Sequence, residues 1–232
     1  MARRTRRLSA ANAIECISKH GVLLVYPIHN RELPRSLWTE FFPDTDMVWD
    51  WNEDADHRVS DMWSLMKLLS SDRRVVYSKW YQGRATFFSR ELFTAMLCLR
   101  RPRLSNEHRS LEDSERALLE VLENNSPLST RRLKELTDLQ GRIHESTYSR
   151  SMKVLFTRLL IVGFGEVDDG AFPSLAVGAT ELMHDDLCRN ADVMTLRDAQ
   201  NQIDRFMPQF SHFRRFWDKT SALALNSPFS GN

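Results

Sequence analysis

The sequence predicts a mainly α fold with small β-hairpins, that is, an α+β protein. Apolar residues recur at helical spacing over long stretches, while short β-prone runs flank glycine-containing turns at Gln82-Gly83 and Asp168-Asp169-Gly170. The composition is globular, with 42% hydrophobic and 27% charged residues. A chain of 232 residues has room for one large domain or for two or three small ones.

The first hundred residues predict helices that alternate with strands. A helix over 9–19 stops at His20-Gly21, and the run 22–28 is β-rich. Pro34 is placed to open a short helix, and an amphipathic helix follows from Val59 to Leu69. Two β-prone runs in 73–89 form a hairpin around Gln82-Gly83, and Ser89 then caps a helix that Pro102 ends.

The pattern becomes sharper after residue 110. A helix over 111–125 ends at Asn124-Asn125, and Ser129 caps a short helix. The longest helix, over 145–160, has a single apolar stripe, made by Tyr148, Met152, Leu155, Phe156, Leu159 and Leu160. The runs 161–167 and 171–177 then flank the turn 168–170 as a hairpin. Helix, helix, longer helix and hairpin is the order of a winged helix-turn-helix, and the first hundred residues loosely echo it.

We therefore expect tandem winged helix-turn-helix modules. Residues 1–8 form a basic tail, 9–103 an N-terminal winged-helix-like module, 104–180 a winged helix-turn-helix, and 181–232 a C-terminal helical segment that Pro208 interrupts. The stretch 100–110 is charged and nearly free of apolar residues, so it is the best candidate for a linker between the modules.

Composition excludes several classes of protein. No apolar run approaches the roughly 20 residues of a membrane helix, and no secretory signal is visible, so we expect a cytoplasmic protein without a membrane association. The cysteines Cys16, Cys98 and Cys188 fit neither a disulfide framework nor a zinc site. The net charge is only +1, so nucleic-acid binding must rest on local patches. The basic tail is either a solvated terminus, which is favoured, or a phosphate contact.

Conventional enzyme motifs are missing from the sequence. It has no nucleophile elbow and no glycine-rich phosphate loop, and we expect no cofactor. The clusters His184-Asp185-Asp186 and Asp54, Asp56 and His57 lack the paired spacing of metal ligands, so we expect no metal. An acidic stretch surrounds two tryptophans and is interpreted as a solvated loop rather than as an acidic, aromatic-walled pocket; its residues are Asp44, Asp46, Trp49, Asp50, Trp51, Glu53, Asp54 and Asp56.

The long helix over 145–160 carries the evidence for DNA binding. Opposite its apolar stripe lie short hydroxyl and basic side chains of the kind that contact phosphates and base edges, namely Ser146, Thr147, Ser149, Arg150 and Lys153. Arg131, Arg132 and Arg142 are expected to flank them. An ordinary solvated helix face would have a similar composition. The acidic residues Glu166, Asp168 and Asp169 would repel phosphate at the tip of the hairpin, which would then contact a protein instead.

Four stretches resemble, in the same order, the AlkZ-related proteins, which are relatives of the winged-helix DNA glycosylases that unhook crosslinked or bulky alkylated bases. They are GVLLVYPIHNRELPRSLW (21–38), YSKWYQGRATFFS (77–89), LEDSERALLEVLENNSPLSTRRLKELTDL (111–139) and the long helix with its hairpin. The resemblance covers roughly residues 12 to 210. It implies a tandem winged-helix architecture and a connection with DNA.

The catalytic glycosylases of that superfamily carry a Gln-x-Gln or Gln-x-Asp pair in their first winged-helix module. This chain has no match there, and the literal copies Gln200-Asn201-Gln202 and Gln202-Ile203-Asp204 lie in the C-terminal segment. We interpret them as a polar helix surface, so the catalytic residues are unknown.

The sequence thus predicts a protein that binds duplex DNA and resembles alkylation-repair and crosslink-repair glycosylases. Catalysis is left open, and if the chain is an enzyme, it is a DNA glycosylase acting on alkylated bases. The alternative is a non-catalytic transcriptional regulator or protein-interaction module, and a protein partner or a homodimer also remains open.

Overall fold

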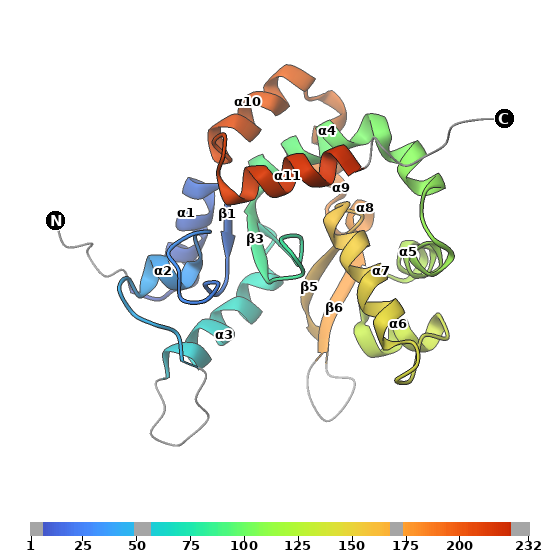
Figure 1. Cartoon of the computed structure of the whole chain (residues 1–232), viewed down its shortest axis with the longest axis horizontal. Coiled ribbons are helices and arrows are strands. Elements are labelled where there is room, and N and C mark those ends of the chain that lie inside the picture. Colours follow the sequence, from blue (N-terminus) through green and yellow to red (C-terminus); the bar gives the residue numbers. More distant parts are fainter. Residues whose placement is uncertain (1–6, 49–56, 168–173, 224–232) are drawn as a thin grey trace.

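The computed structural model describes residues 7–48, 57–167 and 174–223. The first half contains α1 (Ala10–His20), β1 (Val22–Leu24), α2 (Leu37–Phe41), α3 (Arg58–Ser70), β2 (Val75–Ser78), β3 (Thr86–Ser89) and α4 (Arg90–Arg109). The second half contains α5 (Asp113–Asn125), β4 (Leu128–Ser129), α6 (Thr130–Leu136), α7 (Glu145–Thr157), β5 (Ile161–Val167) and β6 (Ser174–Ala179). The C-terminal helices are α8 (Thr180–Met183), α9 (Asp185–Val193), α10 (Leu196–Phe206) and α11 (His212–Leu223) (Figure 1). The predicted α+β fold is confirmed.

One antiparallel sheet runs through the molecule in the strand order β1-β3-β2-β5-β6-β4. Its two halves meet where β2 pairs with β5 at Tyr77 and Gly163. The order helix, strand, helix, helix, strand, strand occurs twice, first from α1 to β3 and again from α5 to β6. The two halves of the sheet therefore join through the corresponding strand of each unit.

Three apolar clusters hold these elements together. One lies among α1, α2, α3 and the first strands, and includes Trp38 and Phe41. Another lies among α5, α6, α7 and the second hairpin, and includes Leu155 and Phe156. The third joins α4, α9, α10 and α11 to both halves of the sheet, and includes Trp80. The C-terminal helices thus pack on residues from both halves of the chain.

Local sequence signals account for several helix ends. Ser89 Oγ accepts a hydrogen bond from the Leu92 amide at 3.2 Å, so it caps α4 as predicted. Gly21 ends α1 at a φ of 75°, and a Cβ at this position would lie 2.5 Å from the ring of Phe206. Glycine is therefore required here both by the backbone conformation and by the close approach of α10.

Two predictions about prolines are wrong. The helix near Pro34 is α2, which begins only at Leu37, because Ser36 Oγ caps it by accepting from the Thr39 amide at 3.1 Å. The helix expected to end at Pro102 continues to Arg109. A proline removes one hydrogen bond from a helix, and α4 is supported by packing against α9 and α10. The proposed linker is therefore helical up to Arg109, while the division of the chain into domains stays a prediction.

Both hairpins form where the sequence predicts them. Strands β2 and β3 pair on either side of the turn that contains Gln82 and Gly83, and β5 pairs with β6. The residues 168–170, which the sequence predicts as the second turn, lie outside the described residues. Within the described part of the chain, no helix is both long enough and apolar enough to cross a bilayer.

A histidine is buried at the junction of α8 and α9. His184 is 1% exposed, and its ring centroid lies 6.4 Å from that of Phe93. Burial lowers the pKa of His184 to about 4, and nearby Arg90 acts in the same direction, whereas Asp186 opposes the shift. The imidazole is therefore neutral in the folded protein at pH 7.

This burial predicts acid-sensitive stability. The unfolded chain takes up a proton at His184 below its ordinary pKa of about 6.5, whereas the folded chain does so only near 4. The free energy of unfolding should therefore decrease as pH falls from about 6.5 to about 4, by on the order of 2 kcal/mol between pH 7 and pH 5. Urea unfolding of the parent and of His184→Gln at both pH values measures this contribution. An equal decrease in the two proteins would contradict the assignment.

Candidate nucleic-acid interface

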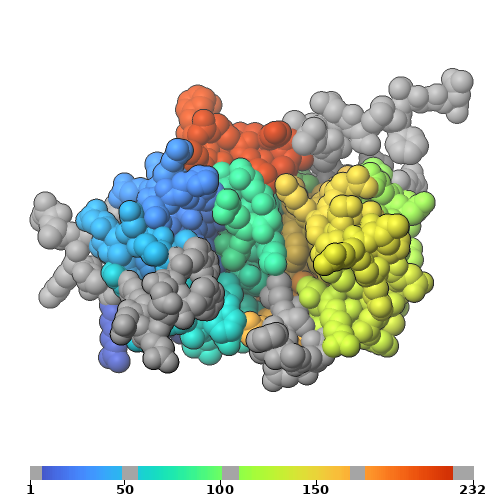
Figure 2. Space-filling model, turned by 60° about the horizontal axis from the view of Figure 1, so that its bottom comes forward, coloured from blue at the N-terminus to red at the C-terminus, as the bar shows by residue number. Residues whose placement is uncertain are grey.

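A hollow of about 710 Å³ lies between α7, α11, α4 and the turn of the first hairpin. Figure 2 shows α7 in yellow facing the hairpin region in green, with α11 in red above them. Among the described residues that line the hollow, every charged one is an arginine, a lysine or a histidine, namely Arg100, Arg150, Lys153, Arg158, His212, Arg215 and Lys219. Tyr81 and Phe216 add aromatic rings to the wall. Ligand pockets in proteins commonly have volumes of roughly 300 to 1,000 Å³.

The apolar stripe of α7 determines which of its side chains reach the hollow. Tyr148, Met152 and Leu155 are buried in the cluster formed with α5 and α6, at exposures of 7% or less. Arg150 and Lys153 lie on the opposite face and are exposed. The same amphipathic pattern that folds this unit therefore presents two cations to the hollow.

The second cationic wall comes from α11, which was not predicted as a binding element. Phe213 and Trp217 are buried at 8% and 5% exposure. His212, Arg215 and Lys219, at helical spacing, line the hollow. The alternation of aromatic and basic residues along 212–219 is the sequence pattern that could have predicted this basic face of α11.

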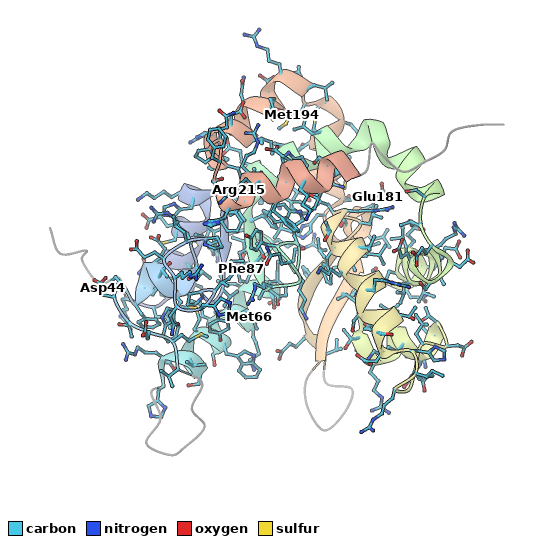
Figure 3. All side chains as sticks on the ribbon, viewed as in Figure 1. Asp44, Met66, Phe87, Glu181, Met194 and Arg215 are labelled. Atoms are coloured by element: carbon cyan, nitrogen blue, oxygen red, sulfur yellow. The ribbon has the colours of Figure 1, made fainter. Side chains whose placement is uncertain are left out.

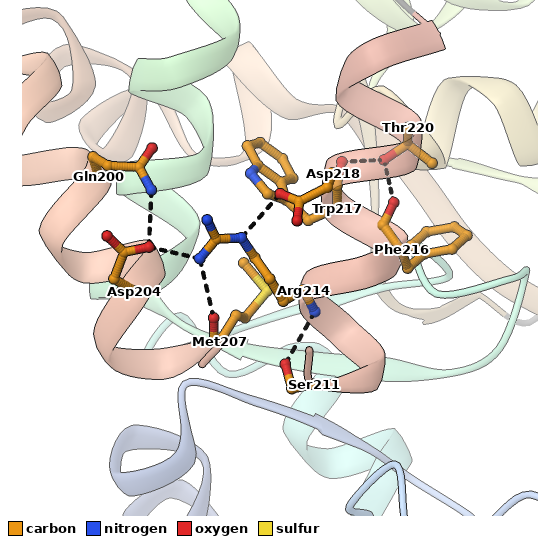
Figure 4. A network of polar contacts seen from close by, with 9 residues as sticks. All are labelled: Gln200, Asp204, Met207, Ser211, Arg214, Phe216, Trp217, Asp218 and Thr220. Carbon is orange, nitrogen blue, oxygen red and sulfur yellow. Dashed lines mark hydrogen bonds and ion pairs between the residues drawn. The ribbon is translucent and has the colours of Figure 1, made fainter. Parts of the chain in front are cut away.

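The face of α11 that carries Arg214 is used to attach it to α10. Arg214 Nη1 pairs with Asp204 at 2.6 Å and its Nε with Asp218 at 2.9 Å. Gln200 Nε2 also donates to Asp204 at 3.0 Å (Figure 4). These contacts fix the orientation of α11, and the neighbouring Arg215 lines the hollow.

A buried arginine forms part of the lining. Arg100 is 2% exposed, and its guanidinium carbon lies 5.1 Å from the centroid of the Trp217 ring. Its Nη2 donates to Thr220 Oγ1 at 3.4 Å. A cation held over an aromatic face keeps its charge with reduced access to water, and such a charge acts strongly on an anionic ligand.

Several of these cations have no acidic partner in the part of the chain that the structure describes. Within the described residues, no carboxylate oxygen lies within 4.0 Å of the charged nitrogens of Lys153, Arg215 or Lys219. Arg150 has one, since its Nη2 lies 3.4 Å from Glu112 Oε2, and both side chains are largely exposed. Burial lowers the pKa of His212, and the neighbouring Arg215 lowers it further. Positive charges held this close repel one another, and an anion placed among them would reduce that repulsion.

The structure separates the sequence-predicted DNA-binding residues into groups. Arg150 and Lys153 line the cationic hollow, and Ser149 lines a smaller hollow beside it that also includes Lys153. Arg131 and Arg132 lie on α6 and both pair with Glu135, at 3.3 and 2.9 Å.

The remaining predicted residues lie outside these surfaces. Arg142 and Ser146 are exposed and Thr147 is half-buried, and none of them lines the two hollows beside α7. Lys79, Tyr81 and the residues of α11 were missed, because their proximity to α7 arises only in the folded chain. Arg158 was also missed, although it directly follows α7 in the sequence.

The other motifs lie elsewhere in the molecule. Figure 3 shows Asp44 beside α2, well separated from Arg215. Asp44 and Asp46 are exposed, while the acidic and tryptophan residues of 49–56 lie outside the described residues. In the described ranges, no group of three or more His, Cys, Asp or Glu side chains is arranged to hold a metal ion.

The chain was compared with known proteins. The model of the family described as AlkZ related matches residues 8–212. A search of curated proteins and a search of solved structures each return no match. The match covers most of the chain, including α7, the first hairpin and the start of α11. The chain therefore belongs to the AlkZ-related family.

Proposed function

We propose that this protein binds duplex DNA through the cationic hollow, with α7 and α11 contacting the phosphate backbone. The observation that carries the proposal is the set of cations from three helices around one concavity without a carboxylate in its described lining. Protein contacts with DNA are dominated by such phosphate interactions. Family membership adds a relation to DNA glycosylases and crosslink repair.

The part of α7 that lines the hollow is long enough to contact a nucleic-acid strand. Residues 150 to 157 of α7 extend over about 10 Å at 1.5 Å per residue, and a strand of DNA advances about 3.4 Å per nucleotide. The face of α7 can therefore follow about three successive nucleotides. The rings of Tyr81 and Phe216, whose centroids lie 5.0 Å apart, offer apolar surface for a base or a sugar.

The architecture supports the same proposal. Each half of the chain has the element order of a winged helix, so we interpret the fold as tandem winged-helix modules. In the second module, α7 occupies the recognition-helix position. Because Arg131 and Arg132 pair with Glu135, we expect them to contribute less to DNA binding than the cations of α7 and α11.

Charge reversal on the two walls tests this proposal. Arg150→Glu with Lys153→Glu, and separately Arg215→Glu with Lys219→Glu, should each abolish binding to duplex DNA. Replacing each pair by Gln should instead weaken binding and reduce the slope of log affinity against log salt by about 2, which is one unit for each phosphate that is no longer neutralised. Fluorescence anisotropy titrations at several salt concentrations provide the measurement.

Matched controls separate binding from folding. Arg131→Gln with Arg132→Gln also removes two positive charges and should change the affinity much less, because Glu135 already neutralises part of that charge. Leu155→Ala removes a fully buried side chain and should cost roughly 2 to 5 kcal/mol of stability. DNA affinity that survives both charge reversals in folded protein would favour the alternative function, a non-catalytic module for protein association or transcriptional regulation.

Catalysis by the relatives' glutamine motif is not part of this proposal. Gln200 lies in the network that joins α10 to α11, and neither Gln200 nor Gln202 lines the cationic hollow. A base-excising enzyme needs its water-activating group next to the extruded nucleotide. Gln200 therefore has a structural role in the proposal, and Gln202 lies outside the hollow.

Replacing both glutamines by Ala should leave any release of alkylated bases within about threefold of the parent rate. Single-turnover assays on alkylated duplex, together with thermal unfolding of the variant, measure this. A decrease of about 100-fold or more at an unchanged melting temperature would establish a catalytic role instead.

A further inference from the structure

A histidine lies among the cations of the larger hollow. His212 is the first residue of α11 and lines the same concavity as Arg215 and Lys219. Ser211 Oγ accepts from the Arg214 amide at 3.2 Å, which fixes the start of α11 and therefore the position of His212 (Figure 4). Among the described residues of the lining, His212 is the one whose ordinary pKa lies near neutrality.

The contact between His212 and Arg215 favours the neutral imidazole. Arg215 Nη2 lies 3.5 Å from His212 Nδ1. A guanidinium has hydrogen-bond donors only, so this contact is favourable when Nδ1 is unprotonated and accepts. The ring proton of the neutral tautomer then lies on Nε2.

The charges around His212 also oppose its protonation. Within the described residues, no carboxylate oxygen lies within 4.0 Å of its ring nitrogens, and Asp204 and Asp218 pair with Arg214 instead. Tyr81 of the hairpin turn adds no charge at neutral pH, because burial raises the pKa of its phenol. The cations that share the lining with His212 come from α4, the α7 region and α11, and they are Arg100, Arg150, Lys153, Arg158, Arg215 and Lys219.

These surroundings set the charge of His212 in the free protein. Burial lowers the pKa of His212, and Arg215 lowers it further. The N-terminal end of a helix carries partial positive charge, which acts in the same direction. A phosphate placed in the hollow reverses the balance, because an anion next to an imidazole stabilises its charged form.

We propose that His212 is a phosphate contact that acts in its protonated form, so that DNA binding takes up a proton at this residue. The inference rests on the proposed DNA binding, which brings phosphates into the hollow. One proton from the solvent adds to Nδ1, and no bond of the DNA changes. Because protonated Nδ1 no longer accepts from Arg215, the guanidinium becomes available to the same phosphate.

The direction of the pH effect follows from the two states of His212. Its pKa is lowered in the free protein and raised when a phosphate is bound. DNA affinity should therefore increase as pH falls through the interval between these two pKa values. Since a single group titrates, the slope of log affinity against pH should not be steeper than about −1.

Binding measurements at several pH values test the inference on the full chain. Duplex DNA is titrated with the protein at constant ionic strength, and we expect the affinity at pH 6 to be about fivefold higher than at pH 8. Calorimetry near pH 7 in two buffers of different ionisation enthalpy counts the protons taken up. The expected uptake is a substantial fraction of one proton per DNA site.

Substitutions at His212 distinguish a proton-dependent contact from a structural role. His212→Gln should bind weakly at both pH values and take up no proton. His212→Lys carries its charge throughout this range, so it should bind at pH 8 about fivefold more tightly than the parent, without a pH dependence. Thermal unfolding of each variant shows that it is folded.

His57→Gln is the matched control. His57 is also an exposed histidine at the start of a helix, directly before α3, but it does not line the cationic hollow. Figure 1 shows α3 well separated from α11. This variant should keep the pH dependence and the proton uptake of the parent.

The failure of this inference can be separated from the failure of DNA binding. Salt-dependent binding that does not change with pH, or proton uptake that persists in His212→Gln, would overturn the role of His212 and leave the DNA-binding proposal intact. If the folded parent does not bind duplex DNA at any pH from about 6 to about 8, both proposals fail.

Discussion

The pairing of β2 with β5 is the contact on which the rest of the arrangement depends. Tyr77 and Gly163 join two three-stranded halves into one sheet. The hairpin turn follows β2 immediately, and α7 ends shortly before β5, so this pairing brings the turn and α7 to the same region. Both hollows beside α7 have residues of the turn on one side and residues of α7 on the other. The concave surface is thus a consequence of sheet continuity.

The C-terminal helices complete this surface. The aromatic residues Phe213 and Trp217 bury one side of α11. Arg214 pairs with Asp204, which joins α11 to α10, and with Asp218, which lies one turn further along α11 itself. Lys219 and Arg215 are then kept close to the cations of α7, at a cost in electrostatic repulsion. A surface that holds like charges together is stabilised when an anion binds, which couples the fold of the C-terminal segment to the proposed function.

The features that could be predicted from the sequence are the local ones. The caps at Ser89 and Ser129 and the apolar stripe of α7 from Tyr148 to Phe156 depend on residues only a few positions apart, and the structure contains them. The last two residues of the predicted stripe, Leu159 and Leu160, are buried but lie beyond the end of α7 at Thr157. The pairing of Arg131 and Arg132 with Glu135 could also have been predicted, because Glu135 lies one helical turn away from both. The continuation of α4 beyond Pro102 was not, since it follows from packing against α9 and α10.

The candidate site was predictable only in part, for the same reason. Arg150 and Lys153 were identified because they lie opposite an apolar stripe. Lys79 is a single lysine in a hairpin turn, and the residues of α11 are more than fifty positions from α7, so only the folded chain brings them together. Hydrophobic periodicity identifies the inward face of a helix, but it does not identify what the outward face will meet.

Photocrosslinking tests the central claim, that α7 and α11 form one DNA-binding surface. A duplex carrying a photoreactive group on a backbone phosphate is bound to the full-length protein and irradiated, and the crosslinked peptides are mapped by mass spectrometry. The account predicts crosslinks to peptides of both helices, including the segments around Lys153 and Lys219. Crosslinks confined to α6 and the second hairpin, with none in α11, would contradict it.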